Sequence, residues 1–345
     1  MIHRIKRRKS WIFLLLLVLL SCNNNETIKF EKFPVEEDLK GKFVDKDYFL
    51  QTSKVYVMND TLALFYSLYN SNEVFYFVSL NDFSLLNVCG KIGKGPGELI
   101  NAGHLYKTDD AIWLSDGIKQ CIYKYPLNEA IYNEHCLPDT SISTQEYGIV
   151  TPYIVKNDSL WVYAGETGEH ILYKVQGTER IGLGMSHIFN PENRLTDINR
   201  SFELFEQHPE KDLFALVYAW DDVLAIMNAD GEVLSRTKGP DMIQKPMENK
   251  ENPNYPVKAY ATVRVDNNYI YGLYSGKKRG YRDENGEFVM TEPASIFVFN
   301  WEGEPVKKIV LEHPAYSFDL DRVHNRIITY SNYLDEEIVC YDYEF

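Results

Sequence analysis

A unit of two short strands recurs six times along this chain, and this repetition limits the fold more than any other feature of the sequence. Each copy begins with a polar turn containing Asp or Asn, continues with a mainly apolar strand, and ends with a second alternating strand. The six turns are anchored at Asp60, Asp110, Asp158, Asp212, Asn268 and Asn325. The anchors lie roughly 50 residues apart, a spacing typical of the blades of a β-propeller.

The repeat predicts an all-β fold, a six-bladed β-propeller of four-stranded antiparallel blades that occupies residues 41–345. After residue 21 the sequence shows no apolar period of 3.6 residues, which excludes a helical solenoid. The inner strand of each blade should precede its anchor turn. The expected inner strands are Lys54–Val57, Ala102–Tyr106, Pro152–Val155, Phe202–Phe205, Ala261–Val265 and Ser317–Leu320. The segment Val44–Gln51 should add a strand to the last blade and so close the ring.

The N-terminus has the layout of a bacterial lipoprotein signal peptide. Five basic residues lie within the first nine positions, and an unbroken apolar run from Trp11 to Leu20 follows them. That run is too short for an ordinary transmembrane anchor, which needs about 20 apolar residues. The sequence Leu19-Leu20-Ser21 before Cys22 resembles a lipobox. We therefore expect a signal peptide at residues 1–21, a lipid on Cys22 and a lipidated tether over residues 22–40.

The charge of the mature chain argues against nucleic acid or anionic lipid as a partner. Removal of residues 1–21 takes away five of the 36 Lys and Arg and none of the 50 Asp and Glu, which leaves a net charge of −19. Nucleic acids and anionic lipids both favour proteins with clustered positive charge. We expect the membrane to be a partner through the N-terminal lipid, with the protein located in the cell envelope.

The six residues Gly93–Glu98, preceded by Lys91 and Ile92, carry a resemblance to a known family. They resemble the IGxGPGE signature of TolB-like six-bladed β-propeller lipoproteins of Gram-negative gut bacteria. This resemblance implies the propeller fold and a periplasmic or surface location, but no settled biochemical activity. The loop lacks the GxxxxGK[ST] order of a phosphate-binding loop, so a crossover between blades is the simpler interpretation.

The four cysteines that follow Cys22 show no CxxC pairing, which argues against a zinc site. Cys121 and Cys136 flank Pro126–Ile131, a segment that reads as the turn between the outer strands of the second blade. Residues placed symmetrically about such a turn face each other across the hairpin. The sequence therefore predicts that Cys121 and Cys136 are neighbours, and an oxidising compartment would allow a disulfide between them.

The candidate ligand-binding residues lie on or near the inner strands, at the mouth of the central channel. Tyrosine and arginine combine flat apolar surface with hydrogen-bond donors, which suits the recognition of a glycan, peptide or protein. Packing that merely fills the channel is the alternative role for these side chains. The candidates are His104, Tyr153, Arg200, Tyr260, Arg264 and Tyr316. Two long loops, at residues 240–257 and 276–292, could also contact a ligand.

No GxSxG or HExxH motif occurs in the sequence, and we expect no cofactor. These features favour a non-enzymatic binding protein anchored to a membrane. The alternative is a calcium-dependent hydrolase or lactonase with its site at the central channel. In that case Asp319, Asp321 and Asn325 could supply ligands for the metal, although turn-capping carboxylates on the rim are the simpler interpretation.

Overall fold

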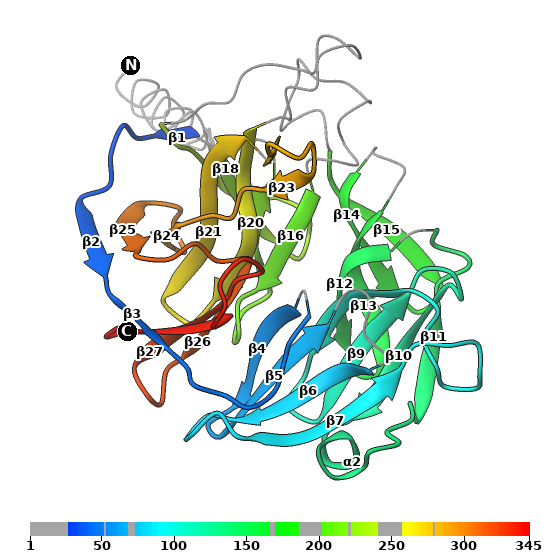
Figure 1. Ribbon diagram of the computed structural model, residues 1–345. Helices are drawn as coiled ribbons and strands as arrows, with labels where there is room; N and C mark the ends of the chain where they lie inside the picture. Colours follow the sequence, from blue (N-terminus) through cyan, green and yellow to red (C-terminus); the bar gives the residue numbers. More distant parts are fainter. Residues whose placement is uncertain are drawn as a thin grey trace, which may run out of the picture.

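The computed structural model describes residues 27–51, 53–67, 73–148, 150–165, 170–185, 202–219, 222–240, 257–278 and 280–345. Six sheets, each built on four antiparallel strands, surround a central axis, and the innermost strand of each sheet faces the middle of the ring (Figure 1). The predicted six-bladed propeller is confirmed.

The first three blades follow one another along the chain, and the strands of each are in sequence order from the channel outward. Blade 1 consists of β4 (Ser53–Asn59), β5 (Leu62–Ser67), β6 (Glu73–Ser79) and β7 (Leu85–Lys91). Blade 2 consists of β8 (Ala102–Lys107), β9 (Ala111–Asp116), β10 (Cys121–Pro126) and β11 (Thr140–Ser143), with helix α2 (Leu127–Tyr132) between its last two strands. Blade 3 consists of β12 (Val150–Lys156), β13 (Ser159–Gly165), β14 (His170–Gln176) and β15 (Glu179–Met185).

The last three blades each receive a strand from the N-terminal part of the chain. Blade 4 consists of β16 (Phe202–Gln207), β17 (Leu213–Tyr218), β18 (Val223–Asn228), β19 (Val233–Lys238) and the added β1 (Thr27–Lys29). Blade 5 consists of β20 (Val257–Val265), β21 (Tyr269–Lys278), β24 (Ser295–Asn300), β25 (Pro305–Leu311) and the added β2 (Val35–Leu39). Blade 6 consists of β26 (Ser317–Asp321), β27 (Arg326–Tyr330), β28 (Ile338–Asp342) and the added β3 (Gly41–Phe43).

All six expected inner strands lie within β4, β8, β12, β16, β20 or β26. The second strand of a blade is covered on both faces by its neighbours, and in β5 and β9 every residue is buried. Strands buried on both faces lose the alternation of apolar and polar residues. This burial explains the continuous apolar runs that follow the anchor turns in the sequence.

The ring closes as expected, but through a different segment. β3 pairs antiparallel with β28, so that Gly41 lies opposite Tyr341 and Phe43 lies opposite Val339. The predicted closing segment, Val44–Gln51, follows β3 and forms no strand. Gly41 allows β3 to pack closely on β28, because a side chain at this position would lie 2.6 Å from Val339 Cγ1.

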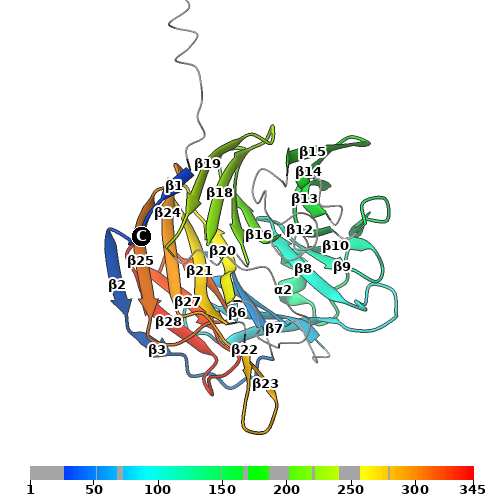
Figure 2. The ribbon, with the colours of Figure 1, turned by 90° about the horizontal axis from the view of Figure 1, so that it is seen from above.

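Strands β1 and β2 lie within residues 22–40, which the sequence suggested as a tether. Both pair in parallel with the outermost strands of their blades, β1 with β19 and β2 with β25. Figure 2 shows β1, β2 and β3 following one another along the outer side of the ring. Among the described residues, strand structure is therefore present from Thr27 onward, ahead of residue 41. Cys22 and the expected signal peptide lie outside the described residues.

The predicted pairing of Cys121 with Cys136 is wrong. Cys136 forms a disulfide with Cys89 of β7, with a Cα–Cα distance of 5.7 Å, whereas Cys121 is a free thiol. The reason is helix α2, which replaces the tight turn expected after Pro126. The extra chain shifts the register of the hairpin, so that Cys121 lies opposite Ser143.

The two long loops differ in what the structure describes. Between β21 and β24, two short strands, β22 (Gly280–Arg282) and β23 (Phe288–Met290), form a hairpin that projects from the ring (Figure 2). Most of the loop at residues 240–257 lies outside the described residues. Within the described part of the chain, no helix has the length and apolar character needed to cross a bilayer.

Candidate functional site

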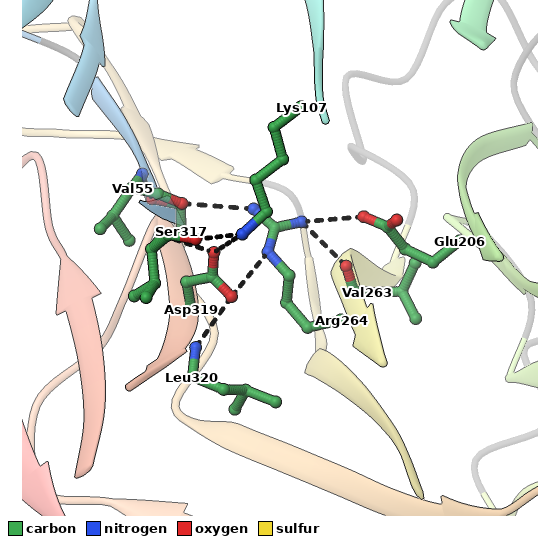
Figure 3. A network of polar contacts seen from close by, with 9 residues as sticks. Val55, Lys107, Glu206, Val263, Arg264, Ser317, Asp319 and Leu320 are labelled. Atoms are coloured by element: carbon green, nitrogen blue, oxygen red, sulfur yellow. Dashed lines mark hydrogen bonds and ion pairs between the residues drawn. The ribbon is translucent and has the colours of Figure 1, made fainter. Parts of the chain in front are cut away.

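The middle of the ring holds a group of four charged side chains, Lys107, Glu206, Arg264 and Asp319, which we call the channel network (Figure 3). Each comes from the inner strand of a different blade, β8, β16, β20 and β26. Each occupies one of the last three positions of its strand. The network therefore lies at the end of the channel where the inner strands turn into the second strands.

Arg264 is the centre of this network. Its Nε lies 3.4 Å from Asp319 Oδ1, and its Nη1 lies 3.4 Å from Glu206 Oε1. The remaining donors reach backbone carbonyls, with Nη1 2.9 Å from Val263 O and Nη2 3.3 Å from Val55 O. The guanidinium also lies over the ring of Tyr56, 4.8 Å from its centroid. Planar geometry and five donors suit arginine to such a crowded position.

Asp319 connects blade 6 to three other blades. Besides Arg264, its carboxylate accepts a hydrogen bond from Val57 N at 2.8 Å and lies 3.6 Å from Lys107 Nζ. Lys107 in turn donates to the carbonyl of Val57. Because Asp319 is only 7% exposed, these contacts supply the compensation that a buried carboxylate requires.

The network has a buried centre and a more accessible edge. The side chains of Lys107 and Glu206 are 36% and 30% exposed, against 10% for Arg264. Burial raises the pKa of the Glu206 carboxyl above its ordinary value, although Arg264 favours the charged form. Burial likewise raises the pKa of Tyr56 to about 12, so its hydroxyl keeps its proton.

His104 lies near the network, and its neighbour Tyr153 belongs to the apolar core between blades 2 and 3. Tyr153 is buried, and its hydroxyl lies 2.9 Å from the carbonyl oxygens of His104 and Trp113. The His104 ring packs edge-on against the Tyr153 ring, with centroids 5.1 Å apart. Burial, followed by the nearby charges of Lys54 and Arg264, lowers the pKa of His104 to about 3. The imidazole is therefore neutral at physiological pH.

The structure brings only some of the predicted site residues together. Arg264 belongs to the network and His104 lies near it, whereas Tyr153 contacts His104 from the core between blades 2 and 3. Tyr260 is buried between blades 4 and 5, where its hydroxyl donates to Asp222 Oδ1 at 3.1 Å. Tyr316 packs on the apolar core between blades 6 and 1. Arg200 lies outside the described residues.

Lys107 and Glu206 were not among the predicted site residues, and Asp319 was predicted only as a possible metal ligand. A usable signal was present, because each of these residues is a charged residue near the end of an otherwise mainly apolar inner strand. Such a side chain must point either into the channel or into the core. An unpaired charge in the core is too costly, so the channel is the expected location.

The three residues considered as calcium ligands do not form a metal site. Asp319 is paired with Arg264 and Lys107, whose positive charges oppose a bound cation. Asp321 is held by His324 and Arg326, at 2.9 and 2.7 Å. Among the residues that the structure describes, no group of three or more His, Cys, Asp or Glu could hold a metal ion.

The glycine-rich loop Gly93–Glu98 is organised by its own glutamate. Glu98 Oε2 accepts a hydrogen bond from Gly95 N at 2.6 Å, and Lys119 Nζ lies 2.5 Å from the Glu98 carbonyl oxygen. A side chain at Gly93 or Gly95 would come within 2.2 or 2.8 Å of Glu98 Oε2. The loop therefore needs glycine to wrap around the carboxylate, which agrees with a crossover between blades.

A protein-family model, described as TolB-like 6-blade propeller-like, matches residues 29–323. Among curated proteins, none matches the sequence significantly. Solved structures with the same fold include one from Bacteroides fragilis, described as a candidate exported protein, with 10% identity and a TM-score of 0.55 over 92% of this chain and 99% of that one. A DUF4221 family member from Bacteroides vulgatus also has 10% identity and a TM-score of 0.55, over 90% of this chain and 96% of that one.

Proposed function

The chain belongs to the TolB-like 6-blade propeller-like family, and we propose that it is an exported lipoprotein whose propeller binds a ligand without catalysing a reaction. Cys22 carries the lipid that anchors it to the cell envelope. The ligand is a glycan, a peptide or a partner protein that the propeller recognises at the channel network.

The observation that carries the binding role is the pairing within the channel network. Arg264 already contacts Asp319 and Glu206, and Asp319 already contacts Lys107. Groups held in this way are poor nucleophiles and bases, but they form a fixed array of charges. The exposed edge of that array offers one cation, Lys107, and one carboxyl group, Glu206. Fixed polar groups at a concave surface are the usual means of orienting a bound ligand.

The anchor rests on the sequence around Cys22, and the fold is compatible with it. Five positions after Cys22 the chain enters β1, so the cysteine precedes the propeller directly, as a lipidation site should. The structurally similar B. fragilis protein is described as a candidate exported protein, which agrees with export of this chain.

The anchor can be tested by metabolic labelling of cells with an alkyne analogue of palmitate. The wild-type protein should take up the label and partition into the detergent phase of Triton X-114. The Cys22→Ser variant should do neither. Labelled, detergent-partitioning Cys22→Ser protein would overturn the assignment of the lipid to this residue.

Binding can be tested with the soluble Cys22→Ser protein on arrays of oligosaccharides and peptides. The proposal predicts binding that is lost in Lys107→Met and Glu206→Gln variants. Lys42→Met is the matched control, because Lys42 is exposed on β3 and pairs with the exposed Asp342 away from the channel network. Binding that survives both network substitutions would contradict the proposed site, and chemical conversion of a bound compound would contradict the non-enzymatic role.

A further inference from the structure

The N-terminal segment forms a belt around half of the propeller. We call residues 27–43 the N-terminal belt, since β1, β2 and β3 in this segment extend blades 4, 5 and 6 in turn. The first contact is between β1 and β19, where Thr27 pairs with Arg236 and Lys29 pairs with Lys238. The chain therefore joins the propeller at the outer rim of blade 4.

Two phenylalanines fix the start of the belt. The Phe33 side chain is 9% exposed and belongs to the apolar core between blades 4 and 5. Its ring centroid lies 4.6 Å from that of Phe297 and 5.6 Å from that of Phe299. Phe30 contacts both Phe33 and Phe299, at 4.8 and 6.0 Å. With these rings packed against blade 5, the belt cannot move away from the rim without opening the core.

The connection from Cys22 to this fixed point is short. Only four residues separate Cys22 from Thr27, so even a fully extended chain spans at most ~18 Å. A domain of this length has a radius of gyration of about 20 Å, which corresponds to a body about 50 Å across. A lipid on Cys22 is thus too close to blade 4 for the opposite side of the ring to reach the bilayer.

We propose that the outer rim of blades 4 and 5 faces the lipid bilayer, with the channel axis running along the membrane and both channel ends open to solvent. This inference rests on the proposed lipidation of Cys22. It assigns the membrane-facing surface to the belt and the outer strands β19 and β25. Blades 1 and 2, which lie across the ring, then point away from the membrane (Figure 1).

The charges at the start of the belt, on the rim of blade 4, suit the surface of a phospholipid bilayer. β1 places Lys29 beside Lys238 and Thr27 beside Arg236, and the exposed Lys32 follows shortly after. These four basic residues lie around β1 on a chain whose mature form carries a net charge of −19, with Glu31 between Lys29 and Lys32. Further along the belt, β2 adds Glu36, Glu37 and Asp38 to the rim of blade 5, where Glu36 and Glu37 pair with Lys308 and Lys307. Anionic lipid headgroups attract such clusters of Lys and Arg.

The inference predicts a measurable difference between two positions on opposite rims. Leu234 on β19 and Leu86 on β7 are both exposed leucines, so each can be replaced by cysteine for a fluorescent donor. Both variants also carry Cys121→Ser, because Cys121 is a partly exposed free thiol that would react with the fluorescent label. Cys340 is buried and can remain. The full-length lipidated protein is reconstituted in vesicles of phosphatidylethanolamine and phosphatidylglycerol that contain an acceptor-labelled lipid.

Energy transfer to the membrane should be at least about twofold more efficient from Leu234→Cys than from Leu86→Cys, because the two positions lie on opposite sides of a body about 50 Å across. A Gly/Ser insertion of about 30 residues between Glu26 and Thr27 spans roughly 30 Å. It should reduce this difference while the protein stays on the vesicles.

Equal transfer from the two positions, or stronger transfer from Leu86→Cys, would overturn the orientation while leaving the lipid anchor intact. A wild-type protein that does not float with the vesicles would overturn the anchor, and the orientation with it. The two failures are therefore distinguishable.

Discussion

Arg264 and Asp319 contact each other across the boundary between blades 5 and 6, with Arg264 Nε 3.4 Å from Asp319 Oδ1. Asp319 also accepts a hydrogen bond from Val57 N in blade 1. Ser317, two residues earlier on β26, accepts a second hydrogen bond at its Oγ from Val55 N at 3.0 Å. The network therefore ties the last blade to the first from inside the channel, while β3 closes the same blade from outside.

The first prediction concerns the loss of the central cation. Arg264→Met should lower the free energy of unfolding by about 3–5 kcal/mol, because it leaves the buried Asp319 without its main partner. Urea denaturation of the soluble Cys22→Ser protein measures this loss. Lys42→Met removes an exposed ion pair with Asp342 and should cost at most about 1 kcal/mol.

A double variant separates the loss of the ion pair between Arg264 and Asp319 from the loss of packing around each side chain. If the uncompensated carboxylate causes the loss, then Arg264→Met combined with Asp319→Asn should be less destabilised than the sum of the two single variants. Strictly additive losses would show that the ion pair contributes nothing beyond the packing of each side chain.

The second prediction is a dependence of stability on pH that His104 causes. The folded state holds the pKa of His104 at about 3, chiefly through burial, whereas an unfolded histidine has a pKa of about 6.5. Below pH 6.5 the unfolded chain therefore binds a proton that the folded chain does not, and stability falls as the pH decreases from about 6.5 toward 3. Between pH 6.5 and pH 5 this difference costs up to ~2 kcal/mol.

His104→Phe keeps a ring against Tyr153 and removes the titration. The variant should lose less stability than the wild type between pH 6.5 and pH 5, as measured by urea denaturation at each pH. In the wild type, the His104 imidazole resonances in an NMR titration should remain those of the neutral ring at pH 5. Parallel stability curves for the two proteins would refute this role.

The third prediction concerns the disulfide between Cys89 and Cys136, which links blade 1 to the segment after α2. It closes a loop with a sequence separation of 47, for which the chain-entropy model gives a stabilisation of about 4 kcal/mol. Cys89→Ser combined with Cys136→Ser should lower the unfolding free energy by about 2–4 kcal/mol. Reductant should have a similar effect on the wild type and little effect on the double variant.

Peptide mapping under non-reducing conditions tests the connectivity directly. The peptide that contains Cys136 should be joined to the peptide that contains Cys89. Cys121→Ser should change neither this bond nor the response to reductant, because Cys121 is a free thiol. A bond from Cys136 to Cys121 would contradict the observed arrangement.

The parts of the fold that could be predicted from the sequence depend on local repetition. Inner strands recur before each Asp or Asn turn, so their positions follow from pattern alone. The disulfide could not be predicted in this way, because Leu127–Tyr132 folds as a helix that packs against β7 of another blade. The strands of the N-terminal belt could not be predicted from the sequence for a related reason. Its strands are short, and they form only because the edges of β19 and β25 are available.

The candidate site could be predicted only in part. Arg264 and His104 were identified because arginine and histidine on an expected inner strand suggest a channel position. The partners of Arg264 come from blades 4 and 6, so their contact depends on the closed ring. Tyr260 was assigned to the channel, but it follows an irregular register in β20 and points into the core between blades.

The last prediction tests why the Gly93–Glu98 loop requires glycine. A methyl group at Gly95 would lie 2.8 Å from Glu98 Oε2 and 2.9 Å from Glu98 Cδ. That carboxylate accepts the hydrogen bond from Gly95 N, so it cannot move away without breaking the contact that organises the loop. Gly95→Ala should therefore lower the unfolding free energy by about 1–3 kcal/mol, a typical cost of losing such a hydrogen bond.

Gly117→Ala is the matched control, because a methyl group at Gly117 meets no atom within 4 Å. It should leave stability unchanged or raise it by up to ~1 kcal/mol, since alanine restricts the unfolded chain more than glycine does. If crowding against Glu98 is the cause, Glu98→Ala should already remove the hydrogen bond, and adding Gly95→Ala should then cost little more. If Gly95→Ala lowers the unfolding free energy as much in the Glu98→Ala protein as in the wild type, then the backbone conformation, and not the Glu98 carboxylate, requires glycine at this position.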